Sequence, residues 1–477
     1  MNAQRLSCDV LVIGAGPAGL AAAAAAREYG ADVICLDLFS RAGGQYHMQP
    51  AAEGGRFERS TQVAGGRAAE KRCHDLGVRF LLETEVFWAE PGFTVYARRG
   101  VDAVTIQATS IVAATGATER PIPFEGWTLP GVIGAGAAQR LIKANATPPG
   151  QNVVLAGTGP FLLAVAQTFA TAGLSLRAFV ERQRPGLGAL SPFLSHPGRL
   201  PEAIGLLRAL KRTGARLHTG HAVLAALGDK CVEAVRLAPL GRDGKPDVDS
   251  AFTIEGIDCL AIGHGFQPGI DFTTLLQARH AFDPDLGGWH CVVDRQTQAT
   301  SIDGLFAAGE TTGIGGSVPA RLSGRLAGLH AGRVASRVTP TDEIETLRRA
   351  ADDARAFARK LATLFPFPAT MIEALPRDEI VCRCEDVTRG AIESAIDDGA
   401  TDAFSVKMWT RAGMGPCQGR MCGTGLAHIV AARTGQSVAD AGYNRPHMPL
   451  RPVPLSTVEA ALTPADPTSP IAQGHDA

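Results

Sequence analysis

The sequence carries almost no net charge and has no long uninterrupted apolar segment. Its 46 Lys and Arg residues are balanced by 47 Asp and Glu residues, which leaves a formal charge of −1 over 477 residues. This balance argues against a nucleic-acid-binding protein held by a broad basic field. The apolar stretch 10–26 is interrupted by Gly14, Gly16, Pro17 and Gly19. It therefore predicts a buried strand and helix instead of a signal peptide or membrane span. We expect a soluble cytoplasmic protein without a transmembrane segment.

Cysteine is also scarce, and common catalytic patterns are missing. Ten cysteines in 477 residues are too few for a secreted disulfide scaffold, so metal binding or redox chemistry is the better interpretation of them. The sequence has no Ser/His/Asp order and no metal-hydrolase motif. Its 45% hydrophobic content supports a real core, and its length predicts two or three domains. Glycine is abundant, with 55 copies and no collagen period, which predicts many tight turns or close backbone approaches.

The N-terminal segment contains a glycine turn of the dinucleotide-binding type. It runs through a strand, a turn, an alanine-rich helix and a second strand that ends in an acid: Cys8–Ile13, Gly14–Gly19, Leu20–Tyr29, Asp32–Leu36 and Asp37. In this motif Gly14 makes the tight turn, Gly16 lets backbone amides reach a pyrophosphate, and Gly19 lets the helix pack against the strand. The helix N-terminus adds positive potential for phosphate. Asp37 is expected to accept hydrogen bonds from an adenosine ribose.

A second copy of the pattern begins near residue 152. Its parts are a strand, a turn, a helix, a second strand and an acid: Asn152–Ala156, Gly157–Gly159, Phe161–Ala172, Leu176–Val180 and Glu181. Leu162 occupies the third glycine position, where it pushes the helix from the strand and narrows the space for a pyrophosphate. The second domain is thus Rossmann-like, and three interpretations stay open: an NAD(P) site, a site for another adenine nucleotide such as ATP, or a structural relic.

Three further strands end in small or polar residues. Ser110–Ala114 leads into Thr115 and Gly116, and the segment 300–310 ends in Gly309 and Glu310. A glycine followed by an acid at a strand end lets the backbone approach a ribityl chain while the carboxylate takes a hydroxyl. The third strand, 258–263, leads into His264 and Gly265 in the second domain.

The motifs GAGPAG, ATG, GTGPFL, AIGHG and FAAGE, in this order, resemble the two-dinucleotide-domain flavoproteins related to glutathione reductase and ferredoxin reductases. The resemblance covers roughly residues 6–335. In that family the first fingerprint holds FAD, the second holds NAD(P)H, and the second domain is inserted in the first. It implies FAD at Gly14, Gly16, Pro17, Ala18, Gly19, Asp37, Arg41, Gly43, Gly44, Gln45, Thr115, Gly116, Gly309 and Glu310. The disulfide reductases carry a cysteine pair after the loop 41–45, and none exists here.

The last hundred residues contain four cysteines in two groups. Cys382-x-Cys384 is separated by 32 residues from Cys417-x4-Cys422. Four thiolates suit a [2Fe–2S] cluster, whereas these spacings fit a structural zinc poorly. A redox disulfide between Cys417 and Cys422 is the third alternative. We predict a helix capped by Thr388 and another that starts at Cys417, where its dipole would stabilise thiolates.

This module resembles the bacterioferritin-associated-ferredoxin type of [2Fe–2S] domain, although that family closes with C-x2-C. The segment GPCQGRMCG and the proline-rich segment 445–455 also resemble the large subunits of heteromeric amine dehydrogenases. That family includes opine, proline and hydroxyproline dehydrogenases, hydrogen cyanide synthase and sarcosine oxidase. The resemblance implies a smaller partner subunit of the D-amino-acid-oxidase type that oxidises the amine, sometimes a third small subunit, and often an FMN at the subunit interface.

The fold class that follows is α/β, with two Rossmann-like domains and a small, mainly helical [2Fe–2S] module. The expected divisions are an FAD domain in two parts, an inserted NAD-like domain, a connecting helix, the iron–sulfur module and a proline-rich extended tail: 1–125 with 256–335, 126–255, 336–375, 376–440 and 441–477.

The leading functional hypothesis is an electron-transferring flavin and iron–sulfur subunit of a dehydrogenase for opines or amino acids. The alternatives are a self-sufficient NAD(P)H-dependent flavin reductase and a non-catalytic scaffold that binds an adenine nucleotide. The catalytic residues and the final electron acceptor are not identified by the sequence. His47 and His264 are interpreted as hydrogen-bonding loop residues. The six other cysteines are expected to be core thiols: Cys8, Cys35, Cys73, Cys231, Cys259 and Cys291.

Overall fold

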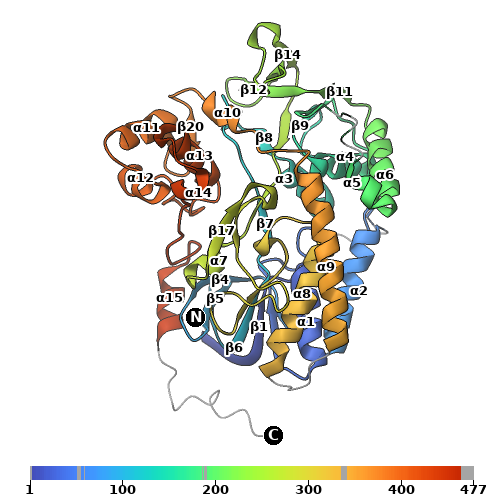
Figure 1. The fold of residues 1–477 in the computed structure, drawn as a ribbon, viewed down its shortest axis with the longest axis vertical. Coiled ribbons are helices and arrows are strands. Elements are labelled where there is room, and N and C mark those ends of the chain that lie inside the picture. The colour runs from blue at the N-terminus through green and yellow to red at the C-terminus, as the bar shows by residue number, and fades with distance from the viewer. Residues whose placement is uncertain are drawn as a thin grey trace.

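The computed structural model describes residues 3–50, 55–58, 60–184, 186, 188, 191–334 and 341–463 (Figure 1). One mixed sheet and one parallel sheet form the centre of the molecule, and a helical C-terminal module lies beside the second sheet. This architecture confirms the expected α/β class with two Rossmann-like domains and a mainly helical C-terminal module.

The first sheet is built around the N-terminal strand. Its parallel part has the order β3-β2-β1-β6-β19, because β19 pairs with the second half of β6. The strands are β1 (Ala3–Ile13), β2 (Val33–Leu36), β3 (Arg79–Leu81), β6 (Asp102–Ala113) and β19 (Leu305–Ala307). The antiparallel strands β5 (Thr94–Arg99) and β4 (Thr84–Ala89) continue the sheet from the first half of β6. The chain thus leaves this sheet after β6 and returns to it only at β19.

Two helices cover one face of this sheet in unusually close contact (Figure 1). They are α1 (Pro17–Glu28) and α8 (Ser317–Ala331), with α2 (Thr61–Asp75) beside α1. A Cβ added at Gly324 or Gly328 would lie 2.1 Å from the carbonyl oxygen of Ala18 or Ala22, respectively. The glycines of α8 therefore permit a backbone-to-backbone approach to α1 that no larger residue allows.

The second sheet consists entirely of parallel strands in the order β11-β10-β9-β15-β8. They are β8 (Val132–Gly134), β9 (Val153–Gly157), β10 (Ala178–Glu181), β11 (Arg216–Thr219) and β15 (Cys259–Gly263). Its principal helices are α3 (Ala135–Asn145), α4 (Pro160–Ala172) and α6 (Leu200–Arg212), and α5 (Ser191–Ser195) is a short turn of helix. A separate antiparallel sheet contains β12 (His221–Leu227), β13 (Ala234–Pro239) and β14 (Phe252–Glu255).

Short elements link these layers. The chain crosses between the two parallel sheets along the antiparallel pair β7 (Ala117–Glu119) and β16 (Phe266–Pro268). After the short helix α7 (Asp271–Leu275), the hairpin of β17 (His280–Asp283) and β18 (Gly288–Cys291) leads back toward β19.

The C-terminal part begins with the long helix α9 (Thr341–Ala362), which lies within the expected connecting helix and packs on α8. The module that follows contains α10 (Ala369–Glu373), β20 (Ile380–Cys382), β21 (Val387–Thr388), α11 (Arg389–Asp397), α12 (Ala403–Thr410), α13 (Gly423–Thr434) and α14 (Val438–Ala441). Within the described ranges, no helix combines the length and apolar character needed to cross a bilayer.

The segment after 441 is not wholly extended, contrary to the expected arm. It ends in α15 (Leu455–Leu462), which returns to the first sheet. Val458 and Ala461 pack with Phe87 and Tyr96, and this apolar contact stabilises the helix. Residues 464–477 of the expected tail lie outside the described residues.

Candidate functional site

The predicted FAD residues gather at the carboxyl edge of the first sheet. Gly14 follows β1 with a φ of +102°, and a Cβ there would lie 2.3 Å from the carbonyl oxygen of Ala114. A Cβ at Gly19 would lie 1.7 Å from the carbonyl oxygen of Gly14. Both positions therefore require glycine. Helix α1 starts at Pro17, and its N-cap Gly16 supplies no side-chain hydrogen bond. The first-turn amides, which have no intrahelical acceptor, are thus available to a phosphate.

Asp37 lies directly after β2 and is turned toward this glycine turn. Its carboxylate accepts hydrogen bonds from the amides of Ala15 at 2.6 Å and Phe39 at 2.9 Å. The side chain is 7% exposed, and burial raises the pKa of the carboxyl, an effect that the two amides partly oppose. The acid is therefore fixed beside the turn at the place where the motif predicts a ribose partner.

The loop 41–45 folds over the same turn. The Gly43 amide donates to the carbonyl oxygen of Ala15 at 2.8 Å, and a Cβ at Gly44 would lie 2.8 Å from the Cα of Gly16. The loop is anchored by His47, whose Nδ1 lies 2.6 Å from the carbonyl oxygen of Gln62, in agreement with its interpretation as a hydrogen-bonding residue. The Arg41 side chain is half-buried and that of Gln45 is exposed.

The ends of β6 and β19 complete the edge. The Thr115 hydroxyl donates to the carbonyl oxygen of Gly269 and lies 3.0 Å from the hydroxyl of Thr311. Gly116 has a φ of +72°, and nothing lies within 4 Å of a Cβ placed there. Gly309 approaches α1 so closely that its Cβ would lie 2.7 Å from that of Ala18. The open space at Gly116 and the uncapped α1 amides therefore fit a dinucleotide such as FAD.

Glu310 caps the neighbouring helix instead of pointing into open space. Its Oε1 accepts a hydrogen bond from the Gly316 amide at 3.0 Å, at the N-terminus of α8. Burial raises the pKa of this carboxyl, and the Gly316 and Gly315 amides oppose that effect. The ribityl contact implied for Glu310 would have to share the carboxylate with this cap.

The second turn repeats the first with a different packing. The amide of Gly159 and the hydroxyl of Thr158 donate to the Glu181 carboxylate at 3.1 and 2.9 Å. Leu162 is 1% exposed, and its Cδ2 lies 3.4 Å from a Cβ placed on Gly263. The leucine thus fills the space that a third glycine would leave between α4 and the strand ends, while Gly159 still faces open space.

Beside this turn lies a buried cationic cluster, which we define as Arg120, Arg182 and His264. The Arg120 guanidinium donates twice to the carbonyl oxygen of His264, at 3.2 and 3.0 Å. Arg182 donates to Gly244 and to Thr370, whereas its Nη1 is buried without a partner among the described residues. Sequence reasoning missed this cluster because its members come from three segments far apart in the chain, and no spacing pattern connects them.

His264 differs from its interpretation as a hydrogen-bonding loop residue. Its ring is 4% exposed, and neither ring nitrogen has a hydrogen-bond partner among the described residues. Burial, followed by the charges of Arg120 and Arg182, lowers the pKa of the ring to about 3. The ring is therefore neutral near pH 7.

The four C-terminal cysteines come together as two pairs. A side-chain hydrogen bond links Cys382 with Cys422, and another links Cys384 with Cys417. The hydrogen bond from Cys422 lowers the pKa of the Cys382 thiol to about 6. Within the described residues, no group of three or more His, Cys, Asp or Glu side chains is arranged around one metal ion. The module therefore offers two thiol pairs, not a single four-ligand point.

The expected helix at Cys417 is wrong. Helix α13 begins at Gly423 with Cys422 as its N-cap, because Gln418 and Gly419 have φ values of +52° and +83° that interrupt a helix. The cap at Thr388 is confirmed, since its hydroxyl accepts from the Ala391 amide. Cys231 is also not a core thiol: it is exposed, whereas the other five predicted core cysteines are buried.

A cavity of about 330 Å³ separates the cysteine module from the first sheet edge. On one side it is lined by Gly269, the hydrogen-bond partner of Thr115 and Gly116. On the other side it is lined by the segment that joins Cys417 to Cys422. Its wall includes two buried groups that have no hydrogen-bond partner in the described part of the chain, the side-chain amide of Asn444 and the indole N–H of Trp289.

The chain is similar to known proteins over nearly its whole length. Residues 8–329 match the family of pyridine nucleotide-disulphide oxidoreductases, and residues 377–462 match the sarcosine oxidase A3 domain. The chain is 31% identical to hydrogen cyanide synthase subunit HcnB of Pseudomonas protegens, over 97% of this chain and 98% of that protein. It is also 31% identical to an opine oxidase subunit of Rhizobium meliloti, over 96% of this chain and 99% of that protein.

The solved structure of L-proline dehydrogenase from P. horikoshii has the same fold, with a TM-score of 0.68 and 21% identity over 96% of this chain and 80% of that one. The resemblance expected from the motifs is thus confirmed over nearly the whole chain. The protein belongs to the pyridine nucleotide-disulphide oxidoreductase family and is a flavoprotein oxidoreductase subunit.

Proposed function

We propose that this chain is the electron-transferring flavin and iron–sulfur subunit of a heteromeric dehydrogenase that oxidises the C–N bond of an opine or amino acid. The oxidation itself is assigned to a smaller partner flavoprotein of the D-amino-acid-oxidase type. The proposed complex also allows for a third small subunit. One observation carries the proposal: the same 330 Å³ cavity is lined by Gly269, which hydrogen-bonds with Thr115 and Gly116 at the nucleotide edge, and by residues 418–420, which lie between Cys417 and Cys422. A carrier at the edge and one at the thiols would then be neighbours, as electron transfer requires.

The residues assigned to FAD have the features that such a ligand needs. Gly16 and the first turn of α1 would bind the pyrophosphate, Asp37 the ribose, and Gly116 and Gly309 would give the ribityl chain and ring access to the strand ends. Bound FAD supplies reversible two-electron and one-electron chemistry. The chain's own residues orient it and exclude water.

The arrangement of the cysteines supports a cluster over the two alternatives. A [2Fe–2S] cluster takes two thiolates on each of two irons, which suits two pairs better than a zinc site of four ligands around one ion does. A disulfide between Cys417 and Cys422 would leave Cys382 and Cys384 unexplained. Lys407, which is 1% exposed and donates to the carbonyl oxygen of Arg445 at 2.9 Å, places a buried positive charge near Cys422. Such a charge compensates the negative charge of bound thiolates.

The proposal also includes an FMN at the subunit interface. The cavity described above supports it, because its unpartnered Asn444 and Trp289 groups can hydrogen-bond a heteroaromatic ring and its Tyr443 and Phe367 can pack against one.

The test is purification of the chain with its neighbouring subunits, followed by analysis of flavin, iron and acid-labile sulfide. We expect FAD and about two irons with two sulfides per chain. Cys422→Ser should abolish the iron and sulfide while FAD remains. Cys231→Ser, at an exposed cysteine outside the module, is the matched control and should change neither. Amine oxidation by this chain alone, without a partner, would contradict the assignment of the oxidation to a second subunit.

The self-sufficient NAD(P)H-dependent flavin reductase is favoured by one observation, the open space beside Gly159 next to Glu181. Leu162 opposes it, because its side chain fills the space between the turn and the strand ends. Rapid bleaching of the bound flavin by NADH would decide in its favour.

A further inference from the structure

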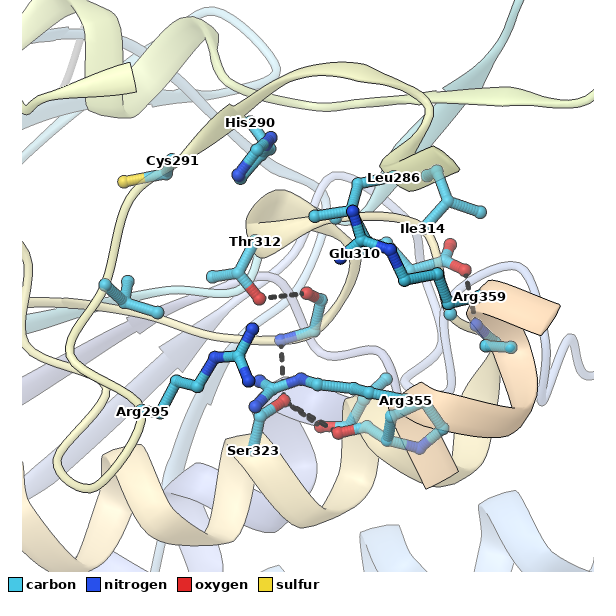
Figure 2. Close-up of a pocket in the computed structure, with 18 of the residues that line it drawn as sticks. Leu286, His290, Cys291, Arg295, Glu310, Thr312, Ile314, Ser323, Arg355 and Arg359 are labelled. Atoms are coloured by element: carbon cyan, nitrogen blue, oxygen red, sulfur yellow. Dashed lines mark hydrogen bonds between the residues drawn. The ribbon is translucent and has the colours of Figure 1, made fainter. Parts of the chain in front are cut away.

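A second cavity, of about 400 Å³, lies between α8, α9 and the segment 286–295 (Figure 2). The Gly309–Gly316 segment forms one wall, but none of the residues of the first glycine turn lines it. It therefore adjoins Gly309 and Glu310, two of the residues assigned to FAD, but not the glycine turn assigned to the pyrophosphate. Leu286 and Ile314 form an apolar part of the wall. The polar side chains lie on the opposite side of the cavity.

The polar side is dominated by arginine. Arg355 from α9 and Arg295 from the loop after β18 turn their guanidinium groups into the same space above Ser323 (Figure 2). Arg355 donates to Gln298 Oε1 at 3.2 Å, and neither arginine forms an ion pair with another described residue. Arg359, the third arginine, differs because it is paired with Asp283 and lies 3.6 Å from Asp285. Two of the three guanidinium groups thus lack a carboxylate.

The two guanidinium groups repel each other. Burial and the charge of Arg295 lower the pKa of Arg355, and the charge of Asp352 opposes them. Two guanidinium groups turned into one space are a geometry suited to a shared oxyanion, because each can donate two parallel hydrogen bonds to a carboxylate or phosphate. The N-terminus of α8 also borders the cavity, since Gly316 and Pro319 line it, but the Glu310 carboxylate already accepts from the Gly316 amide there.

Two carboxylates line the wall, Glu310 and Asp352, and Glu310 already accepts from the Gly316 amide. Asp352 Oδ2 accepts from Arg348 at 3.1 Å, whereas Oδ1 is buried and has no hydrogen-bond partner among the described residues. A buried carboxylate oxygen without a donor is costly. A ligand that carries a hydroxyl or ammonium group near its oxyanion would satisfy this oxygen while the arginines hold the negative end.

We propose that this cavity binds a small oxyanion with an adjacent hydrogen-bond donor, held by Arg295 and Arg355 at the oxyanion and by Asp352 at the donor. A hydroxy acid, an amino acid and a phosphate monoester all have this chemistry, and the volume suits a ligand of metabolite size. Arg295, Arg355 and Asp352 are not among the residues assigned to FAD or to the iron–sulfur cluster, so binding here can be tested whether or not those assignments hold.

The experiment is calorimetric titration of the purified full-length protein, with its partner subunits where they co-purify. The probes are L-malate, L-glutamate, glycerol 3-phosphate and inorganic phosphate, each at matched ionic strength. We expect saturable binding of at least one probe at or below about 1 mM. Arg355→Gln and Arg295→Gln should each weaken it at least about tenfold, because each removes a charge-assisted contact. Arg349→Gln, on an exposed part of the same helix, is the matched control and should change binding less than about twofold.

Asp352→Asn separates the ligand sources. It should weaken malate and glutamate, whose hydroxyl or ammonium group donates to this carboxylate, more than inorganic phosphate, because removal of the wall's negative charge favours the anion with the higher charge density. The class of probe that binds most tightly to the unaltered protein identifies the source. Arg295 lies at the exposed side of the cavity, so Arg295→Gln remains informative if Arg355→Gln fails to fold. Absence of saturable binding of every probe up to about 10 mM, or binding by both arginine variants equal to that of the unaltered protein, would overturn the proposal.

Discussion

The two glycine turns share one backbone plan and differ in what surrounds them. At the first turn Gly19 permits α1 to contact Gly14. Gly116, which follows the neighbouring strand β6, faces open space. At the second turn Leu162 takes the place of that glycine. Gly265, which follows the neighbouring strand β15, is close to Arg120, because a Cβ placed on Gly265 would lie 3.2 Å from the guanidinium group. The motif alone therefore does not decide whether a nucleotide binds. The side chains brought in by distant segments decide it.

The region beside the second turn contacts the C-terminal part of the chain, and the first turn has no matching contact among the described residues. Arg182, directly after its acid, donates to Thr370 in the C-terminal part. Arg120 lies 4.8 Å from the ring centre of Phe367, which stacks on His428 of α13. The region beside the second turn thus connects the second sheet to the cysteine module, whereas the region beside the first turn is left free for a ligand.

The largest expected effect comes from Gly19→Ala. A Cβ at 1.7 Å from the Gly14 carbonyl oxygen cannot be accommodated without a backbone shift, so we expect a loss of at least about 4 kcal/mol of unfolding free energy. Bound flavin should be lost with it. Urea unfolding and the flavin absorbance of the purified protein measure the two effects. Normal flavin content in this variant would remove the main distinction between the turns.

Leu162→Ala should cost about 2–3 kcal/mol, because it removes a fully buried side chain and leaves a cavity. Flavin content should stay unchanged, since Leu162 lies at the second turn. The same urea unfolding and absorbance measurements apply. A drop in flavin equal to that of Gly19→Ala would show that the two turns do not act separately.

The two turns should also differ in how they make stability depend on pH. The strand end beside the second turn carries the ionisable residue His264, whereas the corresponding residue beside the first turn is Thr115. His264 has a pKa of about 3 in the folded protein against an ordinary 6.5, so the unfolded state binds more protons between these values. Its contribution is therefore complete above pH 6.5 and falls by about 1.4 kcal/mol for each pH unit below it.

Unfolding free energies at pH 6.5 and 5 test this expectation. His264→Leu should remove about 2 kcal/mol of the decrease over this interval, and the same substitution at exposed His447 should remove none. An unchanged pH dependence in His264→Leu would mean that the buried ring is not what responds to acid.

The smallest expected effect concerns NADH and NADPH. Because Leu162 and Arg120 fill the surroundings of the second turn, we expect neither reductant to bleach the bound flavin rapidly in a stopped-flow experiment. Protein reduced with dithionite provides the spectrum of full bleaching for comparison. Rapid bleaching would place a working nicotinamide site at the second turn in spite of its packing.

Local patterns in the sequence predicted the elements whose contacts are local. The spacing of glycines and acids predicted both βαβ turns, and Thr388 predicted the start of α11, because caps and tight turns depend on neighbouring residues. The start of α13 was predicted six residues too early, since Gln418 and Gly419 adopt positive φ values that interrupt a helix, and a Cβ at Gly419 would lie 2.9 Å from the Cβ of Asn444, a residue distant in sequence. The cationic cluster and the arginine cavity could not be predicted, because side chains far apart in sequence meet only in the folded chain.

The pairing of β19 with β6 has a consequence for biosynthesis. The first sheet needs residues 305–307 as its fifth parallel strand, and α8 must then dock its glycines on α1. A ribosome adds residues at about 5–20 per second, and domains tend to fold as units as they emerge. The inserted sheet is therefore complete while the first still lacks a strand. Helix α1 cannot pack on α8 until α8 has been synthesised. We expect the nucleotide edge to become competent for flavin only after the last third of the chain has begun to emerge.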